Sequence, residues 1–140
     1  MICAVGDGSL LFNNPVACHH AATSERAPVL VVVYNDDGGT IVLLFLAINS
    51  FCKKNLGYST IRKSTMGYKG QSPWCESTGR MPLVYFDHAS VDYAKIADAC
   101  GGVGMRVNNP VDVLPSLREG LRLVRSGDKH VLLDVRCVRD

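Results

Sequence analysis

Apolar positions near the start of the chain form two short runs separated by a helical pattern. Residues 2–5 are an apolar run that ends at a glycine turn, and residues 29–34 are a continuous run of Val, Leu and Tyr. Continuous β-branched character without alternation is typical of a strand covered on both faces. Residues 10–25 predict a helix, although Pro15 would sit best in a first turn. This order predicts two parallel strands joined by a helical crossover.

The C-terminal part of the chain repeats the same order. Residues 90–100 carry apolar side chains at helical spacing and end at two glycines. Residues 104–107 predict a short strand, and a helix follows that Asp112 can cap, with Pro115 in its first turn. Residues 131–135 predict the last buried strand. The fold class is therefore α/β, with an open, mostly parallel sheet, helices on both faces and a flavodoxin-like layout.

The middle of the chain lacks this periodicity. Residues 67–90 hold several glycines and prolines and predict a long loop, which in α/β proteins often carries function.

The longest purely apolar run, residues 41–48, is far shorter than the roughly 18–20 residues of a membrane-spanning helix. The first residues show no basic region and no cleavage pattern. We therefore expect neither membrane insertion nor a signal peptide.

Composition narrows the class of protein further. A length of 140 residues corresponds to one domain, and 47% apolar with 20% charged residues excludes a disordered chain. The net charge of +2, without a basic stripe, excludes a protein that acts mainly on a nucleic-acid backbone. None of the six cysteines forms a C-x-x-C pair. We therefore expect reduced thiols and a cytoplasmic location.

Acidic clusters follow both of the first two predicted strands. The first strand ends at Gly6-Asp7-Gly8-Ser9 and the second at Asn35-Asp36-Asp37-Gly38. Because parallel strands joined by one crossover end at the same edge of a sheet, we expect the two clusters to lie together. Glycines let backbone N–H groups approach a phosphate, and a helix N-terminus after Ser9 favours negative charge. Carboxylates there would repel the phosphate unless Mg²⁺ lay between, so the spacing predicts a metal–diphosphate site.

The first cluster alone is a weak signal, since a Gly-Asp-Gly sequence is also a common structural turn. It could belong to a dinucleotide-binding fingerprint, but the third glycine of that pattern would fall at Leu11. This departure counts against nicotinamide or flavin binding.

The two clusters together resemble the thiamine diphosphate motif, in which Gly-Asp-Gly is followed one crossover later by Asn-Asn. The surrounding sequence is similar to the C-terminal, pyrophosphate-binding domain of acetolactate-synthase-like enzymes. The similar segments are GDGSLLFNNPVACHHAA, STIRKSTMG, RMPL, DYAKIADACGGVGMRVNNPVDVLPSLREGL and HVLLDVR. It resembles pyruvate and benzoylformate decarboxylases less closely. The resemblance covers nearly the whole chain and implies the thiamine diphosphate-binding fold.

The resemblance also implies a role for each matching residue. Asp7 would bind Mg²⁺, Asp36 stands where the family has its second asparagine ligand, and Gly38 would lend a backbone carbonyl. Gly6, Gly8 and Ser9 would hold the diphosphate. Asn35 and Asp37 remain alternatives for the second metal ligand.

Three departures from the family accompany this resemblance. Asp36 replaces asparagine and adds a charge; two unit charges 4 Å apart repel by about 4 kcal/mol at an effective dielectric near 20. Relative to the family, residues 39–57 form an apolar insertion, for which a retained intron is one hypothesis. In an alternative alignment, residues 39–41 match the pyruvate decarboxylase sequence, and residues 58–67 then have no counterpart in the family. Finally, the glutamate that activates the cofactor belongs to an N-terminal domain that this sequence does not include, so we assign no catalytic residue.

Several polar residues have a simpler interpretation. Cys18, His19 and His20 are adjacent on a helix and point in different directions, so they cannot converge on a metal. We expect His130 to be a loop or surface residue. Asn13 and Asn14 are expected in the first helical turn, near the cofactor.

The sequence therefore predicts a thiamine diphosphate- and Mg²⁺-binding domain from an acetolactate-synthase-like enzyme, a lyase or transferase acting on a small 2-keto acid. Activity would require a homo-oligomer or a partner chain that supplies the missing N-terminal domain. One alternative is a truncated or decayed fragment without activity, acting at most as an interaction module. Another is a different Mg²⁺-phosphate enzyme on a Rossmann-like sheet, for which the sequence offers no nucleophile or base.

Overall fold

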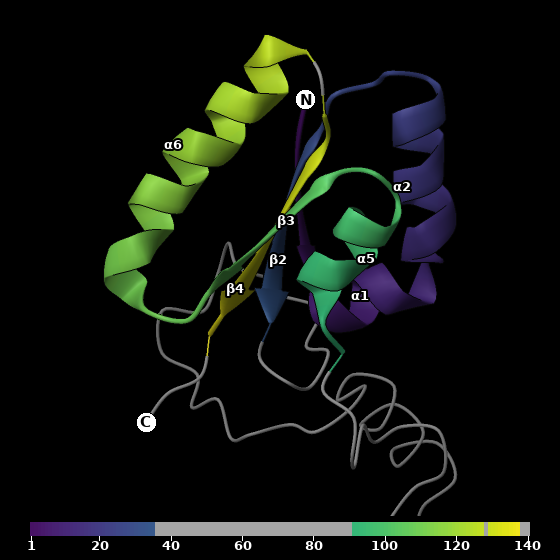
Figure 1. Cartoon of the computed structure of the whole chain (residues 1–140). Coiled ribbons are helices and arrows are strands. Elements are labelled where there is room, and N and C mark those ends of the chain that lie inside the picture. The colour runs from purple at the N-terminus through teal and green to yellow at the C-terminus, as the bar shows by residue number, and fades with distance from the viewer. Residues whose placement is uncertain (36–90, 128, 138–140) are drawn as a thin grey trace, which may run out of the picture.

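Parallel strands and the helices between them build the described part of the chain. The computed structural model describes residues 1–35, 91–127 and 129–137. Their elements are, in order, β1 (Ile2–Gly6), α1 (Asp7–Phe12), α2 (Pro15–Ser24), β2 (Leu30–Asn35), α5 (Tyr93–Ala99), β3 (Val103–Val107), α6 (Pro110–Ser126) and β4 (Val131–Arg136). Within these residues the four strands form one parallel sheet in the order β1-β2-β4-β3 (Figure 1). The predicted α/β class with a parallel sheet is confirmed.

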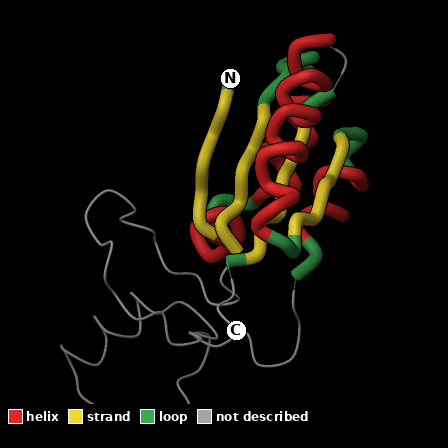
Figure 2. The backbone as a smooth tube through the Cα atoms, turned by 90° about the vertical axis from the view of Figure 1, so that its left-hand side faces the viewer, coloured by secondary structure: helices red, strands yellow, loops and turns green. Residues whose placement is uncertain are grey.

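Helices cover both faces of the sheet, because successive strand residues point to opposite sides. Leu30 and Val32 of β2 pack in a core cluster with the apolar side of α6, whereas Val31 and Val33 pack in a second cluster with α1 and α5. Figure 2 shows the strands side by side beneath α6, and Figure 1 shows α1, α2 and α5 on the other side. The continuous apolar run that predicted a doubly covered strand is thus buried as expected.

The predicted helix over residues 10–25 is wrong in its extent. Two helices replace it, and the break falls at Asn13 and Asn14. Asn14 adopts the left-handed conformation with φ 51°, and its side-chain oxygen accepts a hydrogen bond from Ala17 N at 3.4 Å. Asparagine tolerates this conformation better than most residues and is a good helix N-cap. Pro15 follows at the first position of α2, where its missing N–H costs nothing.

The start of α6 also differs from the prediction. Asn109 is the N-cap and Pro110 the first helical residue, so Asp112 lies in the first turn rather than at the cap. Pro115 consequently lies inside the helix. Either Pro110 or Pro115 could occupy the first turn of this helix, and Pro110 does. At its other end α6 stops at Gly127, whose φ of 84° favours glycine.

Several sequence interpretations fall on residues outside the described part. These are the second half of the acidic cluster after β2, the apolar insertion over residues 39–57 and the long loop over residues 67–90. None of the helices in the described segments has the length and apolar character needed to cross a bilayer.

Candidate functional site

The carboxyl edge of the sheet brings the ends of β1 and β2 together. Gly6, the last residue of β1, pairs in register with Tyr34, one residue before the end of β2. The chain passes from Gly6 directly into α1, whose first residue is Asp7. Asn35 ends β2, whereas Asp36, Asp37 and Gly38 lie outside the described residues. The structure thus places the first acidic cluster beside the strand from which the second one departs.

Asp7 is the buried carboxylate of this edge. Its side chain is 1% exposed, and its Oδ1 accepts a hydrogen bond from Gly8 N at 2.7 Å. Because α1 begins at Asp7 rather than at Leu10 as predicted, Gly8 and Ser9 lie inside its first turn. Backbone N–H groups of a first turn have no partner further back in their own helix. The edge therefore combines a fixed acidic oxygen with adjacent amide donors.

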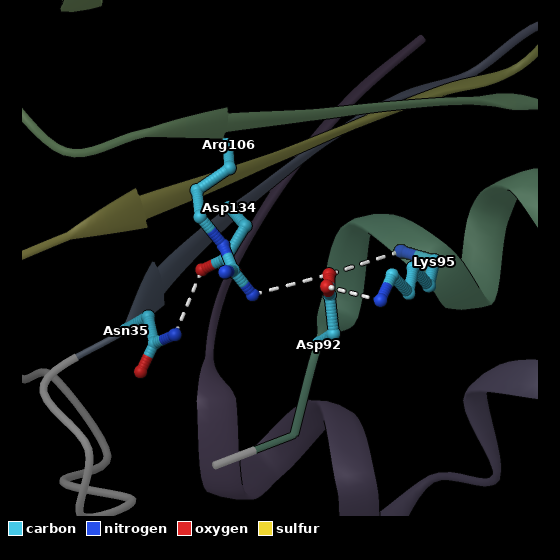
Figure 3. A network of polar contacts seen from close by, with 5 residues as sticks. All are labelled: Asn35, Asp92, Lys95, Arg106 and Asp134. Atoms are coloured by element: carbon cyan, nitrogen blue, oxygen red, sulfur yellow. Dashed lines mark hydrogen bonds and ion pairs between the residues drawn. The ribbon is translucent and has the colours of Figure 1, made fainter.

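A second buried carboxyl group lies nearby, on β4. Asp134 is fully buried, and its Oδ1 accepts a hydrogen bond from Asn35 Nδ2 at 2.8 Å. Arg106 Nε on β3 lies 3.5 Å from Asp134 Oδ2, and Arg106 Nη2 lies 3.1 Å from Asp92 Oδ1 (Figure 3). Burial raises the pKa of the Asp134 carboxyl, while the Asn35 hydrogen bond and Arg106 oppose that rise. This network crosses the sheet from β2 to the start of α5.

Sequence reasoning missed this network. Its members lie far apart in the chain: Asn35 and Asp134 are separated by 99 positions. The register of β2 and β4 brings these two residues together. One signal was available: Asp134 is the single charged residue in the otherwise apolar run that predicted the last strand.

Two histidines occupy the opposite end of the sheet. His19 on α2 and His130, directly before β4, are each 2% exposed, and their ring centroids lie 4.8 Å apart. His130 lies in the loop before β4, as one form of the expectation had it, but it is not a surface residue. Thr23 and the α5–β3 turn cover its ring, and Thr23 Oγ1 lies 3.3 Å from His130 Nδ1. Burial, followed by the charge of His130, lowers the pKa of His19 to about 4. Burial also lowers the pKa of His130.

The histidine pair does not form a second cofactor site. The cavity beside His130 has a volume of about 40 Å³, whereas ligand pockets usually measure roughly 300–1,000 Å³. Nor do any three His, Cys, Asp or Glu side chains within the described segments converge on one point where a metal could bind. The carboxyl edge, with Asp7 and the Asn35–Asp134 pair, is therefore the candidate site.

Comparison with known proteins identifies a family. The family model described as "Thiamine pyrophosphate enzyme, C-terminal TPP binding domain" matches residues 1–135. No curated protein matches the sequence. Among solved structures, the fold is similar to a thiamine diphosphate-dependent 4-hydroxybenzoylformate decarboxylase of Rhodococcus jostii RHA1, with a TM-score of 0.54 and 17% identity. The match covers 99% of this chain and 20% of the decarboxylase, so the chain spans about a fifth of that protein.

Proposed function

Because the chain belongs to the family of C-terminal TPP-binding domains of thiamine pyrophosphate enzymes, we propose that it holds thiamine diphosphate through Mg²⁺ at the carboxyl edge of its sheet. The observation that carries the proposal is the buried carboxylate of Asp7, at the point where β1 passes into α1 beside the end of β2. Oxygen ligands of this kind suit Mg²⁺, which bridges carboxylates and phosphates. The donor set at this edge therefore fits the cofactor.

Each residue of the motif has a specific role in this proposal. Asp7 and Asp36 bind Mg²⁺ through carboxylate oxygens, and Gly38 binds it through its backbone carbonyl. Gly6 lets the chain turn closely past the diphosphate. Ser9 donates N–H and hydroxyl groups to it, and Gly8 donates its N–H in place of the hydrogen bond to Asp7 Oδ1. Asn35 and Asp37 remain the alternatives for the second ligand, since the hydrogen bond from Asn35 Nδ2 to Asp134 does not use the amide oxygen that would bind a metal.

The reaction proposed for the complete protein is acetolactate-synthase-like. When bound, thiamine diphosphate supplies a carbon nucleophile and an electron sink for making or breaking a C–C bond next to the carbonyl of a 2-keto acid. The residues of this chain bind and orient the diphosphate end of the cofactor. The activating glutamate comes from an N-terminal domain, supplied by a further part of the protein or by a partner subunit. The domain then works in the cytoplasm as part of an oligomer.

A calorimetric titration tests the proposal. Thiamine diphosphate is titrated into the folded chain in Mg²⁺ and, separately, in EDTA. We expect saturable binding in Mg²⁺ only, and we expect the Asp7→Asn variant to lose it because the amide removes one anionic ligand. Glu119→Gln is the control, since Glu119 is an exposed partner of Arg122 on α6. A folded chain that binds no cofactor in Mg²⁺ would overturn the proposal and favour the inactive fragment.

A further inference from the structure

The carboxyl group of Asp134 lies in an unusual place for a charged residue. It is fully buried in β4, which lies between two neighbours, β2 and β3, in the described sheet. A buried carboxyl group is costly unless hydrogen bonds and opposite charges compensate it, and an apolar residue at such a place is often equally or more stable. Oδ2 makes no hydrogen bond among the described residues and has only the Arg106 ion pair, at 3.5 Å. Stability alone therefore does not account for a carboxyl group here.

Asp134 faces the same side of the sheet as the candidate site. Leu133 and Val135 belong to the cluster under α6, whereas Leu132 belongs to the cluster under α1 and α5. Alternation along the strand places Asp134 with Leu132 on the α1 face. In register, Val135 pairs with Tyr34, which pairs with Gly6. Asp134 thus lies one residue deeper in the sheet than the end of β1.

Asp134 also controls the side chain that ends β2. Asn35 is 5% exposed, and it contacts the C-terminal segment twice: Nδ2 donates to Asp134 Oδ1 at 2.8 Å, and its carbonyl accepts from Cys137 N at 2.8 Å. Because an amide group is planar, fixing Nδ2 on Asp134 directs the amide oxygen to the other side. Figure 3 shows that oxygen pointing away from Asp134. The next residue along the chain is Asp36, the proposed metal ligand.

We propose that Asp134 is a positioning residue for the metal–diphosphate site: it holds Asn35 in one orientation and so fixes the strand end from which the second acidic cluster continues. This inference rests on the proposed function. Asp134 itself touches neither metal nor cofactor. Arg106 holds the far oxygen of Asp134 and connects it to Asp92, which caps α5 by accepting from Lys95 N at 3.2 Å.

Two substitutions at Asp134 separate positioning from packing. Asp134→Leu removes the acceptor for Asn35, whereas Asp134→Asn retains one acceptor oxygen at the same place. Supporting residues around metal sites typically contribute roughly 10–100-fold to affinity. We expect Asp134→Leu to weaken Mg²⁺-dependent binding of thiamine diphosphate by a factor of this order. We expect Asp134→Asn to restore most of it.

Binding is measured by calorimetry on the full chain at a temperature where every variant is folded. The matched control is Glu119→Gln, which removes the Arg122–carboxylate pair on α6. A readout without ligand accompanies it: the side-chain amide resonances of Asn35 shift in Asp134→Leu and keep their position in Asp134→Asn. Equal affinity of Asp134→Leu and the unsubstituted chain would overturn the inference while leaving the proposed function intact. Absence of binding by the unsubstituted chain would overturn both.

Asn35→Ala tests the same contact from the other strand and carries the test if Asp134→Leu does not fold. We expect it to weaken binding by a similar factor, and we expect Asp134→Ala, which removes the acceptor, to add little in its background, because the two substitutions remove one interaction. Unchanged affinity of Asn35→Ala, or fully additive losses of Asn35→Ala and Asp134→Ala, would contradict the inference.

Discussion

Protonation of His19 should destabilise the folded chain as the pH falls. Its ring is 2% exposed, its Nδ1 has no hydrogen-bond partner among the described residues, and His130 lies next to it. Burial, followed by the charge of His130, lowers the pKa of His19 from 6.5 to about 4. The neutral form is therefore the one that fits the fold. Its stabilising contribution is complete above pH 6.5 and is lost as the pH falls toward 4.

The expected size of the effect follows from the two pKa values. Linkage between a folded pKa of about 4 and an unfolded pKa of 6.5 gives a loss of about 2 kcal/mol between pH 7.5 and pH 5. The lowered pKa of His130 adds to the loss in the same direction. A loss of this size is a substantial part of the stability of a small domain, which is usually about 5–15 kcal/mol.

Urea unfolding at the two pH values measures the effect. Carboxyl groups elsewhere titrate over the same range, so the informative quantity is the difference between the unsubstituted chain and His19→Phe, which fills the same buried space without a titrating group. We expect His19→Phe to lose about 2 kcal/mol less than the unsubstituted chain when the pH is lowered to 5. His20→Gln, on the exposed side of the same helix, should behave as the unsubstituted chain does. An identical pH dependence in His19→Phe would refute the reasoning.

Three further predictions concern glycines and the metal ligand. Gly104→Ala should lower the free energy of unfolding by about 1–3 kcal/mol or more in urea, because its Cβ would clash with the backbone carbonyl of Ala94; a neutral result would contradict this backbone contact. Gly127→Ala should cost only about 1–2 kcal/mol in the same assay, because φ is +84° but the added Cβ would meet no described atom within 4 Å; a loss as large as that of Gly104→Ala would contradict this. Asp36→Asn should tighten Mg²⁺-dependent binding of thiamine diphosphate in calorimetry, because it removes a charge beside the diphosphate; unchanged or weaker binding would argue against repulsion by Asp36.

The described strands could be predicted from the sequence to within about one residue. For β2 and β4 the reason is their Val- and Leu-rich runs, which leave little choice between strand and other structure. Helix boundaries were harder. The Asn13–Asn14 break and the start of α6 depend on local side-chain caps, and a proline marks a first turn only when no earlier proline takes that place. Asn109 and Pro110 supplied that earlier start.

The candidate site also contains residues that the sequence could reveal and residues that it could not. Asp7 could be found from a short motif, because its place after a strand is a local property of the sequence. The Asn35–Asp134–Arg106 contacts could not, since they depend on which strands are neighbours and on their register. The burial of His130 was missed for a related reason: its cover comes from Thr23 and from the turn before β3, distant in the chain.

The strand order has a consequence for how this chain reaches its native state during synthesis. β4 is the last of the described strands along the chain, yet it lies between β2 and β3 and joins them. Until β4 is synthesised, β1 and β2 are the only described strands that pair with each other, and two-stranded pairs have marginal stability in water. The apolar face of α6 likewise has no complete sheet to cover. A nascent chain that stops before residue 131 would therefore lose the centre of its sheet, and its exposed strand edges would be open to aggregation.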